Sequence, residues 1–155
     1  MNHVLTRGLL AAALAALCAG AQAQTPAASP QALAELAKAA PHLVAALECR
    51  KKLVYTDAVK VFIKDPNSFD EVVLPAPLTV FGIKTSTINV TEDDQNGGGG
   101  YNARFTGLSQ KDAARAARVK GPGYKRHVKG GGMIEVGTTG NAASYIACIY
   151  GAGEG

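Results

Sequence analysis

The sequence predicts a small α+β domain in which N-terminal helices pack on one face of a twisted antiparallel sheet of about four strands. Apolar residues recur at spacings of three and four in the N-terminal third, and at a spacing of two from Leu78 onward. Two cysteines, Cys49 and Cys148, are available for one disulfide. The expected order of elements is α-α-β-β-α-β-β.

The first residues predict a cleaved secretory signal peptide that spans residues 1–23. One basic residue, Arg7, precedes an unbroken small and apolar stretch at residues 8–19. Ala21 and Ala23 then place small side chains at the two positions that a signal peptidase reads. The apolar stretch is too short to cross the ~30 Å of a membrane's hydrocarbon core, which favours cleavage over anchoring.

Cys18 lies inside this stretch and raises the alternative of a lipoprotein, in which cleavage before a cysteine leaves it acylated. Leu17 precedes that cysteine, where lipoprotein signals have Gly, Ala or Ser, so simple cleavage is the preferred interpretation. We therefore expect a periplasmic or secreted protein with no transmembrane segment after cleavage. Residues 24–29 would form a flexible lead and residues 30–155 a single small domain.

The helical region is expected to begin at Ser29, a favourable N-cap, with Pro30 at the first helical position. Pro41 interrupts the apolar stripe, and a proline inside a helix removes a hydrogen bond. We therefore expect a kink or two helices that meet near Ala40, the second running to about Lys52. A further short helix is expected over residues 58–64, capped by Thr56 and Asp57. The stripe consists of Leu33, Leu36, Ala40, Leu43 and Leu47.

Alternating apolar residues predict the strands. One long strand is expected from Leu78 to Val90, joined by a polar, glycine-rich connection to a second strand at residues 101–105. Ser109 and Asp112 approximate a capping box for a helix of small residues. Short strands at residues 124–128 and 133–136, and a last strand at 143–150, complete the sheet.

The order of these elements is similar to that of small inhibitor and assembly domains of bacterial envelopes, such as β-lactamase-inhibitor-protein-like modules. The likeness is one of architecture alone. It implies a helix-backed antiparallel sheet, and it transfers no site residues to this chain.

Cys49 and Cys148 are the two cysteines that remain after cleavage. In an oxidising compartment such a pair most simply forms a disulfide, and neither cysteine has a histidine or cysteine neighbour at metal-ligand spacing. Their separation of 99 positions makes the bridge worth roughly 4 to 5 kcal/mol in the chain-entropy model. The bridge would attach the helical half to the C-terminal strand.

The usual signatures of enzymes and cofactor-binding proteins are missing from the sequence. It contains no nucleophile elbow, zinc-protease motif, phosphate-binding loop or C-x-x-C pair. His42 and His127 are interpreted as a helix neighbour and as part of a basic surface. We predict no enzyme activity, no cofactor and no metal site, with a small hydrolase of unfamiliar site as a further alternative.

Charge is distributed asymmetrically in a chain whose formal net charge is +4. Residues 111–129 contain seven basic residues against Asp112, and residues 65–94 contain six acidic residues against Lys84. A basic surface raises the rate of encounter with acidic partners, although such side chains also keep helix faces and strand edges soluble. The candidate interaction surface comprises Arg115, Arg118, Lys120, Lys125, Arg126, His127 and Lys129.

These observations lead to the hypothesis of an exported, non-enzymatic interaction module, either an inhibitor or an assembly partner of another envelope or secreted protein. The alternative is an electrostatic binder of an anionic envelope polymer or lipid surface, which would dissociate steeply as salt rises. Nucleic acid is not an expected partner, because the net charge is modest and the compartment is wrong.

Overall fold

The computed structural model describes residues 28–93, 98–121, 123–130, 132–139 and 143–151. The predicted signal peptide and most of the predicted flexible lead lie outside these residues, as does the middle of the glycine-rich connection before Tyr101.

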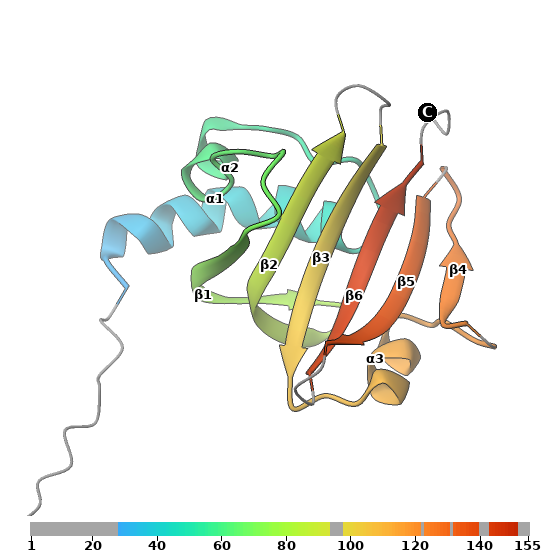
Figure 1. The fold of residues 1–155 in the computed structure, drawn as a ribbon. Coiled ribbons are helices and arrows are strands. Elements are labelled where there is room, and N and C mark those ends of the chain that lie inside the picture. The colour runs from blue at the N-terminus through green and yellow to red at the C-terminus, as the bar shows by residue number, and fades with distance from the viewer. Residues whose placement is uncertain (1–27, 94–97, 122, 131, 140–142, 152–155) are drawn as a thin grey trace, which may run out of the picture.

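Three helices and a six-stranded antiparallel sheet make up the described residues (Figure 1). The strands lie side by side in the order β1-β2-β3-β6-β5-β4. The α+β class and the antiparallel sheet are therefore confirmed, whereas the expected number of about four strands was wrong. The helices are α1 (Pro30–Leu47), α2 (Asp57–Phe62) and α3 (Gln110–Ala116); the strands are β1 (Glu71–Val80), β2 (Ile83–Asp93), β3 (Gly98–Thr106), β4 (Lys125–His127), β5 (Gly132–Thr139) and β6 (Ala143–Tyr150).

One extra strand arises because residues 71–93 form a hairpin and not one long strand, and the other because three strands, β4, β5 and β6, follow α3 where the expected order had two. Phe81 and Gly82 have φ values of 51° and 79°, so both turn residues adopt the left-handed conformation of a tight two-residue hairpin. Phenylalanine is not a turn residue by preference, so the sequence conceals the turn. Pro75 and Pro77 lie within β1, which is at the edge of the sheet, where a missing N–H donor is tolerated.

Helix α1 runs as one helix through Pro41, so the alternative of two helices that meet near Ala40 was wrong. Pro41 is exposed, and its ring therefore disturbs only the outer side of the helix. The helix ends at Leu47 and not near Lys52. Cys49 follows with a φ of 58°, and the backbone N–H of Arg50 donates to the carbonyl of Ala45, which closes the last turn.

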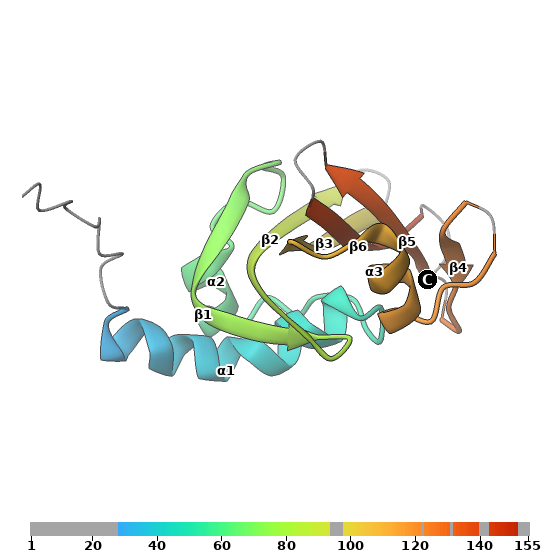
Figure 2. The same cartoon turned by 90° about the horizontal axis from the view of Figure 1, so that it is seen from below.

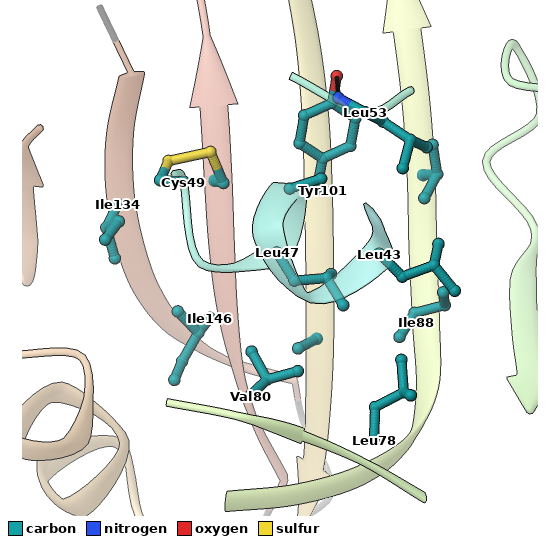
Figure 3. Close-up of a cluster of buried hydrophobic side chains, with 14 of the residues drawn as sticks. Leu43, Leu47, Cys49, Leu53, Leu78, Val80, Ile88, Tyr101, Ile134 and Ile146 are labelled. Carbon is teal, nitrogen blue, oxygen red and sulfur yellow. Dashed lines mark hydrogen bonds between the residues drawn. A yellow bond between two sulfur atoms is a disulfide. The ribbon is translucent and has the colours of Figure 1, made fainter. Parts of the chain in front are cut away.

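The core lies between α1 and the sheet, as Figure 3 shows. Leu43 of α1 lies beside Ile88 of β2, and Leu47 and Ile146 of β6 belong to the same buried cluster. Cys49 and Cys148 form the predicted disulfide, with a Cα–Cα distance of 5.2 Å. The chain segment after α1 is thus covalently attached to a central strand.

Among the described residues, no helix covers the second side of the sheet. Helix α1 contacts β1, β3 and β6, α2 packs against α1, and α3 contacts β5 and β6. Figures 1 and 2 place α1 and α3 on the same side of the sheet. No helix among the described residues is both long and apolar enough to cross a membrane.

Candidate functional site

The free side of the sheet, here called the bare face, is assembled by strand register. Because side chains alternate along each strand, cross-strand partners share a face. The middle row of this face crosses all six strands and consists of Glu71, Asn89, Asn102, Ala147, Glu135 and Lys125.

Two further rows flank the middle row. One consists of Val73, Thr87, Arg104, Tyr145 and Gly137, and the other of Thr91, Gly100, Ile149, Met133 and His127. Gly100 and Ala147 carry little or no side chain and sit diagonally on neighbouring strands. The centre of the bare face is therefore low, with larger side chains around it.

A hollow of about 490 Å³ lies over this low centre. Gly100, Asn102 and Ala147 lie at its base, and Phe69 and Tyr145 are among the side chains around it. A second hollow adjoins it through Phe69 and Tyr145 and extends to Glu71 and Arg104. The two form one trough across β2, β3 and β6.

Two apolar side chains at the β1 end of the trough are highly exposed. Phe69 is 83% exposed and Val73 is 76% exposed. Glu71 lies between them in sequence and forms an ion pair with Arg104 of β3. The Arg104 Nη2 also donates to the Thr139 hydroxyl at 3.1 Å, so the guanidinium is held by partners on two sides.

The opposite wall of the trough is formed by Tyr145, whose ring occupies the space beside Gly137. A Cβ at Gly137 would lie 2.3 Å from the ring, so only glycine allows this placement. The Tyr145 hydroxyl donates to Glu135 at 3.3 Å, and Lys125 forms an ion pair with the same carboxylate at 2.9 Å. Burial, reinforced by the Glu135 charge, raises the pKa of Tyr145 above its ordinary value.

The amide side chains in the trough are ordered by mutual hydrogen bonds. The Asn102 side-chain amide donates to Asn89 Oδ1 at 3.2 Å. The Asn89 amide donates to the carbonyl of Asp70 at 2.9 Å, just before β1. Each amide therefore has a set orientation before any ligand arrives.

The predicted basic surface is divided by the fold. Lys125 and His127 lie on the bare face, because they are register partners of Glu135 and Met133. Arg126 points the other way, and its Nη2 donates to the carbonyl of Ala117 at 3.1 Å. Arg115, Arg118 and Lys120 lie around a separate hollow beside α3, and Lys129 is exposed after β4.

Sequence reasoning missed most of the bare face. The alternation that identified the buried residues of β3 and β6 also placed Asn102, Arg104 and Tyr145 on the opposite side, but nothing in the sequence showed which side the helices cover. Phe69 carried a clearer signal, since a lone aromatic residue within the polar segment 65–70 has no partners nearby in sequence.

The residues that the structure describes contain no group of three or more His, Cys, Asp or Glu side chains that could hold a metal ion. Comparison of the chain with protein-family models, curated proteins and solved structures found no match.

Proposed function

We propose that this chain is an exported interaction module that binds a polypeptide segment of another envelope or secreted protein on its bare face, as an inhibitor or an assembly partner. The observation that carries the proposal is the exposure of Phe69 and Val73 beside the trough. The Cys49–Cys148 disulfide is consistent with the oxidising compartment that export implies.

Exposed apolar side chains favour a partner that removes them from water. Fully burying a Phe or Val side chain contributes about 1.5–3 kcal/mol. The trough adds Tyr145 and Arg104, residue types that are enriched where interfaces carry most of their binding energy. An apolar anchor beside an arginine and a tyrosine is the arrangement expected at the centre of a protein interface.

The polar groups of the trough support the proposal because they are already positioned. Arg104 is held by Glu71 and Thr139, and the Asn89–Asn102 pair is held by the carbonyl of Asp70. Side chains that are ordered before association lose less conformational entropy on binding. A partner with an apolar side chain for Phe69 and backbone or side-chain amides for the two asparagines fits this surface.

Affinity capture with matched variants tests the proposal. Oxidised wild-type protein, Phe69→Ser and Val61→Ser are each immobilised and exposed to envelope and secreted extracts, and captured proteins are quantified by mass spectrometry. Val61 is the control because it is also exposed, at 48%, but belongs to α2. A protein retained stoichiometrically by wild type and Val61→Ser, and reduced at least about tenfold by Phe69→Ser, supports the bare face.

A second variant tests the bare face without changing the segment that contains Phe69. Gly137→Ala displaces the Tyr145 ring from the other wall of the trough and should also weaken capture. Equal recovery of every protein by all four forms would remove the bare face from consideration.

A further inference from the structure

A hollow of about 900 Å³ beside α3 plays no part in the bare face. Helix α3 lies on the helix-covered side of the sheet, where it contacts β5 and β6 (Figure 2). Four exposed cations line the hollow: Lys111, Arg115, Arg118 and Lys120. None of the described residues that line it carries a carboxylate.

Asp112, the one carboxylate within α3, is already engaged. The Ser109 hydroxyl donates to its Oδ2 at 2.6 Å, and Arg115 forms an ion pair with its Oδ1 at 2.7 Å. The hydrogen bond from Ser109, with the charge of Arg115, lowers the pKa of Asp112. Asp112 brings one negative charge beside the four cations, so the hollow keeps an excess of positive charge.

The helix dipole explains only some of these cations. Arg118 and Lys120 follow the C-terminus of α3, where positive charge is stabilising. Lys111 lies in the first turn, directly after Gln110, where the same dipole disfavours a cation. The dipole of α3 therefore does not account for Lys111, which also lines the hollow.

The inner surface of the hollow is apolar. Ala114 and Val119 are buried and line it, and Tyr124 is half-buried at its side. Arg118 and Tyr124 both have positive φ values, 55° and 50°, which non-glycine residues rarely adopt. The local chain path that holds a cation and an aromatic ring at this hollow is therefore a conformation imposed by the surrounding fold.

We propose that the basic hollow binds an acidic polypeptide segment in which an apolar side chain separates carboxylates. Cations around an apolar base match carboxylates on either side of an apolar residue. A flat bilayer surface does not enter a hollow, and a bare polyphosphate has nothing to place on Ala114 and Val119. The site is distinct from the bare face, and its occupant need not be the same partner.

Fluorescence anisotropy tests this site with a dye-labelled peptide in which glutamates alternate with leucines. The variant Lys111→Gln/Arg118→Asn/Lys120→Gln removes three cations of the hollow. Asparagine is chosen at position 118 because it tolerates the left-handed conformation. We expect this variant to bind the peptide about tenfold more weakly than wild type, and the wild-type affinity to fall as salt rises.

The matched control removes the same charge elsewhere. Lys38→Gln/Lys60→Gln/Lys64→Gln alters exposed lysines on and just after α1 and α2, and should change the affinity by less than about twofold. Equal weakening in both triple variants would show attraction to net charge and overturn the site. Equal affinity for an all-glutamate peptide would overturn the role of the apolar base.

Two further arms separate this proposal from its alternatives. Vesicles of anionic phospholipid are titrated in place of the peptide, and vesicle binding without peptide binding would overturn the polypeptide assignment in favour of a lipid surface. Phe69→Ser is expected to bind the peptide as wild type does. The basic hollow and the bare face can therefore fail separately.

Discussion

Replacing both Cys49 and Cys148 with alanine is expected to lower the free energy of unfolding by about 5 kcal/mol. The bridge joins the segment after α1 to β6, a central strand, and Cys148 is fully buried. Without the bridge, the helical half of the unfolded chain is no longer tied to the β6 segment, so the unfolded state gains conformational entropy.

The magnitude follows from the length of chain that the bridge closes. A sequence separation of 99 corresponds in the chain-entropy model to about 4.7 kcal/mol of unfolded-state entropy at 25 °C. Loss of two buried sulfur atoms adds a smaller packing term. Against a typical domain stability of about 5–15 kcal/mol, the loss is enough to leave an appreciable unfolded fraction.

Urea unfolding followed by far-UV circular dichroism measures this loss. Oxidised wild type, reduced wild type and the double-alanine variant are compared, with the denaturant slope fitted separately for each. The two forms without a bridge should unfold at lower urea and with a larger slope, because an unconstrained unfolded chain exposes more surface. Gly132→Ala is measured beside these forms to test how closely the bridge is packed, since its new Cβ would lie 3.1 Å from Cys49 Sγ.

A loss below about 1 kcal/mol in the double-alanine variant would refute the reasoning, because it would mean that the unfolded chain gains little freedom when the bridge is absent. A large loss on reduction with none in the double-alanine variant would assign the effect to buried thiols in place of chain entropy.

Two other changes in stability follow from the buried tyrosines. Tyr101→Phe leaves the buried Leu53 N–H without the acceptor that it meets at 3.2 Å, so the free energy of unfolding in urea should fall by about 1–3 kcal/mol; an unchanged midpoint would contradict this. Burial raises the pKa of Tyr101, Tyr145 and Tyr150, with Glu92 and Glu135 adding to the first two. The unfolded chain therefore loses these protons first, so stability should be complete below pH 10.0 and decline above it; a urea midpoint that stays constant to higher pH would count against the burial of these hydroxyls.

Elements with strong local signals were predictable from the sequence. Ser29, Thr56 and Ser109 each accept a hydrogen bond as N-caps, because a cap needs only residues within one turn. The last strand, Ala143–Tyr150, begins and ends as its alternation predicted. The pairing of Cys49 with Cys148 followed from their number and from the predicted export.

Features that depend on distant residues were not predictable. The turn at Phe81 and Gly82 requires a left-handed phenylalanine, which is stabilised where the Phe81 N–H donates to Glu48 at 2.7 Å, beyond the end of α1. Helix α1 continues through Pro41 because Leu43 and Leu47 on its other side are buried in the core. In both cases tertiary contacts outweigh a local preference.

The sequence by itself determined the fold class, the helix starts, the last strand and the partners of the disulfide, since these follow from residue spacing and local hydrogen bonding. Only the tertiary structure decided which side of the sheet stays open and that Phe69, Arg104 and Tyr145 meet there. Alternation gives every strand two faces, and the helices that cover one of them reach it through contacts between residues far apart in the chain.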